Sequence, residues 1–378
     1  GRSMQFDTVI IGGGITGMSL SWFLAEEGVS VLCLDHGRDS GSTANAGSMH
    51  VQMQSRLASL YPERIDEFER TLWLYPLAVE LWKQLAERLE EDIELRITGG
   101  LMVAENNEQM DSLERKSARE NRNGVETSLL DRGDLERIAP YLGDAFVGAN
   151  YCSLEGKVNP LLANAAIERR AKNAGATIRR ETDVTGIERR GSMFEIASSA
   201  GRFNARRVVI AAGARSGELA TALGCTLTAQ AEPLHMNVTN PAPRTIEHLV
   251  QHAARPVTLK QLHSGHVVIG GGWPARAGDT PQVLLDSVLG NLELAGHMVP
   301  AINGLQLLRT WAGINPVTDL LSVLGGVDRV PGLYIALPGD AGYTLGPICA
   351  RLLADTLLGR PAEYPLDDFS PDRFAVLS

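Results

Sequence analysis

The sequence predicts an α/β protein with two domains. One is a Rossmann-like domain, with a parallel sheet that is discontinuous in sequence, and the other has a mainly antiparallel sheet. Three observations predict this fold. Residues 8–35 have the pattern of a strand, a glycine turn, a helix and a second strand. Residues 207–214 and 333–337 are further apolar strands that lead into small residues or a glycine turn. Residues 238–272 alternate as the strands of an antiparallel sheet do.

The glycine turn has the spacing of a dinucleotide-binding motif. Gly12 allows the tight turn after the first strand, Gly14 lets the backbone approach a pyrophosphate, and Gly17 lets the helix lie close to the sheet. Asp35 ends the second strand, where a carboxylate accepts hydrogen bonds from both ribose hydroxyls. The alternative is an ordinary turn between a strand and a helix that binds no nucleotide. The strand before the turn, the helix after it and the acid at the expected distance all favour a nucleotide-binding turn. Because an acid disfavours a 2′-phosphate, the motif indicates FAD or NAD.

The composition limits the classes of function. The length of 378 residues suits two domains. The formal net charge of −10 argues against nucleic acid or an anionic membrane as the main partner, because both are negatively charged. The four cysteines are scattered, without a CxxC pair or the spacing of metal ligands. We therefore expect reduced core thiols, no metal and a cytoplasmic location.

Two small-residue segments suit contact with a flat ligand. Residues 41–50 are almost all small, so their amides are accessible to a ligand; a flexible surface loop is the alternative. Residues 338–343 form a second glycine turn, between a strand and a helix over 344–358. A second helix N-terminus is therefore predicted at the far end of the same ligand.

The intervening segments complete the two domains. We expect helices within 62–95 and 105–137, and over 161–173 and 281–298. The predicted nucleotide-binding domain comprises residues 4–95, 150–226 and 306–378. The predicted substrate-binding domain comprises residues 96–149 and 227–305.

Six segments together resemble the D-amino-acid oxidase and glycine oxidase superfamily of FAD enzymes, over nearly the whole chain. They are IGGGITG with Asp35, the AGSM loop, EGKVNP, VVIAAGARSGEL, RTWAGINPVTD and GLYIALPGDAGYTLGP. The resemblance implies FAD rather than NAD, with Asp35 at the adenosine ribose and Val184 framing the adenine. It also places the 42–50 loop beside the pyrophosphate and flavin, and the 339–345 turn at the pyrimidine edge of the flavin. The cofactor-binding residues that it implies are Gly12, Gly14, Ile15, Thr16, Gly17, Asp35, His36, Ser42, Thr43, Asn45, Ala46, Gly47, Ser48, Met49, Val184, Ala212, Gly213, Gly313, Gly339, Gly342, Tyr343, Thr344 and Leu345.

Two segments look like the flavin subunits of heteromeric bacterial dehydrogenases: SGSTANAGSMHVQMQS and VTLKQLHSGHVVIGGGWPA. The similar subunits are those of opine oxidases, D-hydroxyproline dehydrogenase and hydrogen cyanide synthase. This similarity implies a larger partner subunit with further cofactors, often a second FAD and an iron–sulfur centre. Because this chain has no clustered cysteines, we expect any such cluster on the partner.

The sequence departs from glycine oxidases where an arginine would bind the substrate carboxylate. Asn315 and Asp340 stand at the two positions that carry arginine in that pattern. We hypothesise that Asp340 faces a cationic part of the substrate; a structural role in the turn is the alternative. Other possible contacts to substrate are His50, Arg56 and the pair Lys260–Gln261, whereas Arg309 is expected to pair with Asp319 in the core.

These residues define three hypotheses about function. The first is oxidation of a C–N bond in a secondary amine, imino acid or opine by hydride transfer to flavin N5, with electrons passed to a partner subunit or a quinone chain. The second is a self-sufficient oxidase that acts on glycine, sarcosine or a D-amino acid and makes peroxide from oxygen. The third is a non-catalytic flavin subunit for electron transfer. The first hypothesis assigns substrate chemistry to Asp340, His50, Lys260 and Asn315.

Overall fold

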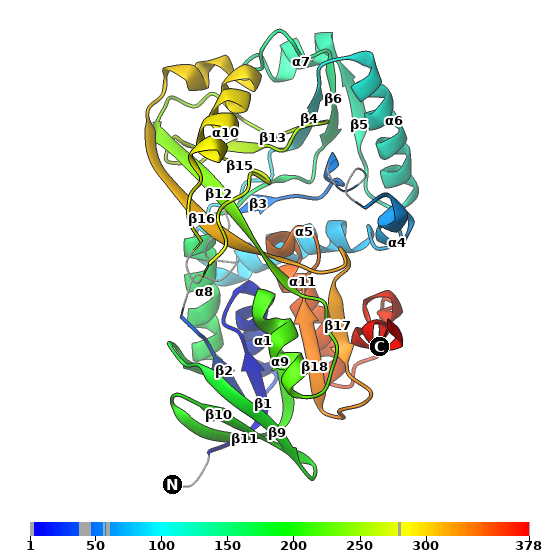
Figure 1. The fold of residues 1–378 in the computed structure, drawn as a ribbon, viewed down its shortest axis with the longest axis vertical. Coiled ribbons are helices and arrows are strands. Elements are labelled where there is room, and N and C mark those ends of the chain that lie inside the picture. Colours follow the sequence, from blue (N-terminus) through cyan, green and yellow to red (C-terminus); the bar gives the residue numbers. More distant parts are fainter. Residues whose placement is uncertain (1–3, 38–46, 56, 58–60, 279–280, 378) are drawn as a thin grey trace.

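The computed structural model describes residues 4–37, 47–55, 57, 61–278 and 281–377. The chain forms two large sheets, one at each end of the molecule, with a short two-stranded sheet between them (Figure 1). Two of the segments that carry the sequence motifs, β3 (Ser48–Met49) and β7 (Gly156–Lys157), pair in this short sheet. The predicted α/β fold with a parallel and a mainly antiparallel sheet is confirmed.

The first sheet has a parallel centre. Its main strand order is β17-β18-β11-β1-β2-β8, and β10 and β9 continue from β11 as an antiparallel meander. The pairs β18–β11, β11–β1, β1–β2 and β2–β8 are parallel, whereas β17 is antiparallel to β18. The strands are β1 (Met4–Ile11), β2 (Val31–Leu34), β8 (Thr177–Arg179), β9 (Val184–Arg190), β10 (Met193–Ser198), β11 (Gly201–Ile210), β17 (Val323–Gly326) and β18 (Leu333–Leu337).

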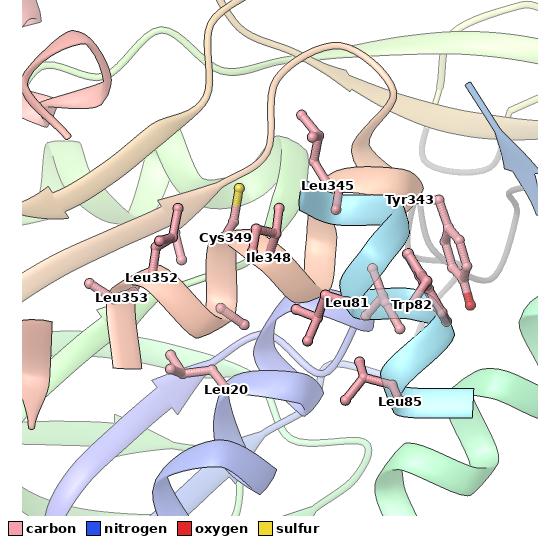
Figure 2. Packing of buried hydrophobic residues seen from close by; sticks show 14 of the residues in the cluster. Leu20, Leu81, Trp82, Leu85, Tyr343, Leu345, Ile348, Cys349, Leu352 and Leu353 are labelled. Carbon is pink, nitrogen blue, oxygen red and sulfur yellow. The ribbon is translucent and has the colours of Figure 1, made fainter. Parts of the chain in front are cut away.

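Four helices pack together with this sheet in one core. They are α1 (Ile15–Ala25), α5 (Leu74–Leu89), α8 (Pro160–Asn173) and α11 (Gly342–Leu357). Helix α1 is buried along its whole length, which explains why its sequence shows no polar face. Figure 2 shows α5 against α11, where the Trp82 ring stacks on Tyr343 with 5.5 Å between ring centroids. The short helix α4 (Ile65–Glu69) adds Phe68 to this core, whereas α9 (Ser216–Ala222) packs in a second apolar cluster with strands of the same sheet.

The second sheet has the order β16-β12-β15-β14-β13-β4-β6-β5, and only its β13–β4 pair is parallel. Its strands are β4 (Gly100–Ala104), β5 (Ser128–Asp131), β6 (Gly148–Cys152), β12 (Gln230–Pro241), β13 (Leu249–His252), β14 (Thr258–Gln261), β15 (His266–Gly270) and β16 (Leu307–Val317). Apolar residues on one face pack with helices α7 (Arg132–Ile138) and α10 (Leu285–Met298). Helix α6 (Asn107–Arg122) lies beside β5 (Figure 1) and packs against the other face, where its Leu113 contacts Met102 and Ala104 of β4.

Some expected boundaries differ from the structure. Residues 306–378 were expected in the nucleotide-binding domain, but β16 pairs with β12 in the second sheet. Strand β6 likewise joins the second sheet, although residues 150–152 were expected in the first domain. The charged segment 105–137 contains the strand β5 between its two helices, and α10 begins at Leu285 rather than at 281. In the described part of the chain, no helix combines the length and apolar character needed to cross a membrane.

Candidate cofactor and active site

A cavity of about 710 Å³ lies at the carboxyl ends of the parallel strands. The ends of β1, β2, β11 and β18 all contribute to it, through Ile11, Leu34, Ala211 and Leu337. In open α/β sheets, ligands bind at this edge. The cavity therefore has the place and the size, roughly 300–1,000 Å³, of a site for a cofactor or other small molecule.

The glycine turn forms one wall of this cavity, and its glycines are sterically required. Gly12 has φ +121°, and a Cβ atom there would lie 2.0 Å from the carbonyl oxygen of Ala211. A Cβ atom on Gly17 would lie 1.9 Å from the carbonyl oxygen of Gly12. Helix α1 starts directly after Gly14, so its first backbone N–H groups point toward the turn. This geometry suits a pyrophosphate at a helix N-terminus.

The carboxylate of Asp35 lies over the same turn. A Cβ atom on Gly13 would lie 2.6 Å from Asp35 Cγ, so the Asp35 carboxylate can occupy this position only because residue 13 is glycine. Asp35 Oδ1 accepts a hydrogen bond from the Gly37 N–H at 3.2 Å, and Asp35 Oδ2 is 3.8 Å from an Arg180 guanidinium nitrogen. His36 lies beside Asp35 and pairs with Asp183 at 2.7 Å. Both Asp35 and His36 line the cavity, as does Val184.

The second glycine turn also lines the cavity. Gly339, Gly342 and Tyr343 line it, and α11 begins at Gly342. The Tyr343 hydroxyl donates a hydrogen bond to Asn164 Oδ1 at 2.9 Å, away from the turn, so this side chain belongs to the core (Figure 2). Gly346, one turn into α11, leaves no room for a Cβ atom, which would lie 2.6 Å from the Ile15 side chain of α1. The two helices that begin at the glycine turns are therefore in direct contact.

A small cavity of about 40 Å³ adjoins the large one at this turn. Asn315, Pro316 and Gly339 line both cavities. Asp340 and Glu232 also line the small cavity, so two acidic residues lie beside Asn315. The structure thus brings Asn315 and Asp340 together from β16 and the second glycine turn.

Lys260 lies on the face of the second sheet that is directed toward β3. Its side chain is 1% exposed, and its Nζ donates a hydrogen bond to Ser48 Oγ at 2.6 Å. Burial and, to a smaller extent, the nearby Lys157 ammonium together lower the pKa of Lys260 to about 7. A fully buried amine with a shifted pKa, next to the predicted flavin loop, is a feature of functional sites.

The remaining predicted residues fall into three groups. Ser42, Thr43, Asn45, Ala46 and Arg56 lie outside the described residues. The second group lines the cavity: Gly12, Gly14, Ile15, Thr16, Asp35, His36, Val184, Ala212, Gly213, Gly339, Gly342 and Tyr343. The third group does not line the cavity: Gly17, Gly47, Met49, Gly313, Thr344 and Leu345.

Two expectations about side chains were wrong. Gln261 is not available to a substrate, because its side chain binds backbone groups of residues 242–246 and 265 through five hydrogen bonds. Arg309 is exposed and lies over the Trp311 ring, whereas Asp319 pairs with Arg373 at 2.7 Å. The sequence interpretation also missed Arg180, whose position beside Asp35 depends on the β2–β8 pairing.

The residues present fit FAD. Asp35, the glycine turn before α1 and the glycine turn before α11 all line the one cavity. Asp35 and Val184 would hold the adenosine, the α1 N-terminus the pyrophosphate, and the turn before α11 the flavin end. Among the described residues, no group of three His, Cys, Asp or Glu side chains is placed to hold a metal ion.

Comparisons with known proteins agree with this site. Residues 7–356 match the model of the family described as DAO, FAD dependent oxidoreductase. The chain is 27% identical to an opine oxidase subunit of Rhizobium meliloti, over 98% of both chains. It is 28% identical to glycine oxidase of Geobacillus kaustophilus, over 98% of this chain and 97% of the relative. The crystal structure of a glycine oxidase from Geobacillus kaustophilus superposes with a TM-score of 0.85 and 26% identity, over 98% of this chain and 99% of that one. The chain therefore belongs to the DAO family of FAD-dependent oxidoreductases and is a flavoenzyme.

Proposed function

We propose that this enzyme oxidises a C–N bond in a secondary amine that also carries a carboxylate, such as an opine or a D-hydroxyproline-like imino acid. The similarity to an opine oxidase subunit and to a glycine oxidase supports an amine of the amino-acid type. The observation that carries the proposal is the buried Lys260 Nζ, bound to Ser48 at 2.6 Å on the sheet face above β3.

Bound FAD supplies the two-electron acceptor for this oxidation. What the chain must supply is the orientation of the substrate. A protonated Lys260 binds a carboxylate strongly, because an ion pair is less screened in a buried site than in water. Ser48 holds the Lys260 side chain in place, and Lys157, which donates a hydrogen bond to the Gln261 carbonyl, adds positive charge nearby. Lys260 is therefore our proposed carboxylate anchor, in place of the arginines that this sequence lacks.

Asp340 and Asn315 form the second part of the proposed substrate site. Both line the small cavity at the second glycine turn, together with Glu232. Carboxylates there suit a cationic group, such as a secondary ammonium or a guanidinium. The Asp340 N–H donates to the Leu320 carbonyl, and its own carbonyl accepts a hydrogen bond from the Tyr75 hydroxyl at 2.8 Å. These backbone contacts fix the turn whichever role the side chain has. His50, in the segment after β3, is our further proposed substrate contact.

We also propose that electrons leave through a larger partner subunit or a quinone chain. Support comes from relatives whose names denote subunits, those of an opine oxidase and of a sarcosine oxidase. The four cysteines are separate buried thiols, so an iron–sulfur cluster would have to be bound by the partner.

Anaerobic bleaching of the flavin tests the proposed reaction. The purified holoenzyme is mixed under nitrogen with opines, hydroxyproline isomers, sarcosine, glycine and D-amino acids, with and without a co-expressed partner subunit. We expect rapid bleaching by an opine or a hydroxyproline isomer and slow reoxidation by air. If dithionite bleaches the flavin and every amine fails, also with the partner present, the proposal is wrong and a non-catalytic electron-transfer subunit is supported.

The second candidate function is a self-sufficient oxidase, which the similarity to glycine oxidases favours. Such an enzyme would be bleached by glycine or sarcosine and would release one peroxide per flavin when air is admitted. The same experiment therefore separates the two functions by substrate and by electron acceptor.

A further inference from the structure

Three consecutive backbone N–H groups that follow β3 donate to buried carboxylates. The N–H groups of Val51 and Gln52 donate to Glu155 Oε2 at 2.8 and 3.2 Å. The Met53 N–H donates to Glu120 Oε2 at 2.8 Å. The two acids come from distant parts of the sequence, the turn before β7 and helix α6. The segment 51–53 is therefore held by side chains rather than by a neighbouring strand.

Glu155 is fully buried beneath the second sheet. Its other carboxylate oxygen, Oε1, accepts a hydrogen bond from Gln52 Nε2 at 2.7 Å. Gly100 of β4 makes room for this carboxylate, because a Cβ atom there would lie 2.0 Å from Glu155 Oε1. Burial raises the pKa of Glu155 to about 7, although the hydrogen bonds from Gln52 and Val51 oppose that shift.

Glu120 is also fully buried and is held by further contacts. Its oxygens accept hydrogen bonds from Asn150 Nδ2 and Thr127 Oγ1, both at 3.0 Å, and pair with Lys116 Nζ at 2.9 Å. Lys116 Nζ also donates to Gln52 Oε1 at 2.8 Å. Gln52 thus links the Glu155 and Lys116–Glu120 groups into one network under the segment.

This network is expensive in free energy for a purely structural role. It places two fully buried carboxylates near one ammonium that is 11% exposed, and such groups are often replaceable by apolar residues without loss of stability. What the carboxylates provide is a defined position for residues 51–53. The same chain carries Ser48, the partner of Lys260, and His50 on its way to this segment.

We infer that Glu120 and Glu155 are positioning residues, which hold residues 48–53 in the geometry that the flavin and the substrate anchor Lys260 require. The expected effect on substrate oxidation rests on the proposed function. The hydrogen bonds from the two carboxylates to the three N–H groups can be tested without substrate.

Hydrogen exchange of the holoenzyme tests the inference, with Glu155→Gln and Glu120→Gln as variants. Both oxygens of each carboxylate accept hydrogen bonds, and an amide replaces one of these oxygens with an NH2 donor. At least one of the hydrogen bonds is therefore lost in each variant, so the hold on residues 51–53 weakens. We expect exchange of the peptide covering 48–55 to become at least tenfold faster in both variants. We also expect kcat/KM to fall at least tenfold. Unchanged exchange in both folded variants would overturn the inference, whatever the activity.

Two further variants keep the test decisive. Glu105→Gln is the matched control, because Glu105 is a partly buried acid that pairs with His252 and His297 on the opposite face of the second sheet. It should leave exchange at 48–55 and kcat/KM unchanged. Gly100→Ala retains every hydrogen-bonding group but displaces the Glu155 carboxylate, so it should reproduce the exchange pattern of Glu155→Gln if that variant does not fold. If no amine reduces the flavin yet exchange responds as expected, the proposed function fails while the positioning role stands.

Discussion

Lys260 combines two possible roles in one buried amine, and its pH dependence separates them. Because burial lowers its pKa to about 7, the ammonium form is lost from the free enzyme as the pH rises through neutrality. A carboxylate anchor acts as the ammonium, whereas a proton acceptor for the substrate amine acts as the neutral form. We therefore predict that the Lys260 contribution to kcat/KM falls as the pH rises from 6 to 9, about tenfold per unit well above the pKa.

The variant Lys260→Met isolates this contribution from the ionisation of the substrate amine. The ratio of wild-type to variant kcat/KM should be large at pH 6 and shrink toward pH 9, with most of the defect in KM. A ratio that instead grows with pH would assign Lys260 to proton transfer. A ratio near one at every pH would dismiss it from the site.

Asp340 gives a second prediction about a single side chain. Asp340→Asn removes a negative charge from the small cavity beside Asn315 and retains the backbone contacts to Leu320 and Tyr75. If the carboxylate faces a cationic part of the substrate, kcat/KM should fall roughly 10- to 100-fold, as expected for a lost charge-assisted hydrogen bond of about 1.5–3 kcal/mol. The flavin absorption spectrum should stay as in wild type. Wild-type kinetics would leave Asp340 with a structural role only.

Single residues were predictable where local geometry alone determines their place. The spacing of Gly12, Gly17 and Asp35 follows from one turn and two strands, and the structure places these residues as expected. Glu120 and Glu155 carry no such local signal, because their contacts with residues 51–53 span 67 to 104 positions in sequence. A buried acid looks like any surface acid until the fold is known.

Among the elements, the contact between the two turn-bearing helices and the sheet depends on glycine. Gly17→Ala places a methyl group 1.9 Å from the Gly12 carbonyl, a backbone atom that cannot rotate away. We predict a loss of about 1–3 kcal/mol in stability and weaker retention of FAD, because the α1 N-terminus must shift. Flavin content after gel filtration and thermal unfolding of the apoprotein measure the two effects. Gly304→Ala, where no atom lies within 4 Å of the added methyl group, should change neither.

The elements also show why domain boundaries are harder to predict than strands. The pattern of residues 307–317 indicates a strand, but the choice of sheet depends on pairing with β12, about seventy residues earlier. Strand β12 has twelve residues and pairs with β15 on one edge and with β16 on the other, so β16 becomes the outer strand of the second sheet. Alternation along one strand does not encode which distant strand lies beside it.

At the scale of the whole molecule, the flavin cavity and the proposed substrate anchor belong to different sheets. The cavity lies at the edge of the first sheet, whereas Lys260 projects from the second toward β3. Segment 48–53 contacts Lys260 through Ser48 and is held by Glu155 and Glu120. The sequence motifs predict the cofactor end because they are local. The proposed substrate residues Lys260, Asn315 and Asp340 could be named from the sequence, but their contacts arise from long-range packing and required the structure.

The most direct test of the proposed function compares matched secondary and primary amines in single-turnover reduction. The holoenzyme is mixed anaerobically with an N-substituted amino acid and, separately, with its unsubstituted parent, and bleaching of the flavin is followed by stopped flow. We predict that an opine or hydroxyproline substrate reduces the flavin at least a hundredfold faster than the primary amino acid at equal concentration. Equal or faster reduction by the primary amino acid, with peroxide formed in air, would contradict the proposal and establish an amino-acid oxidase.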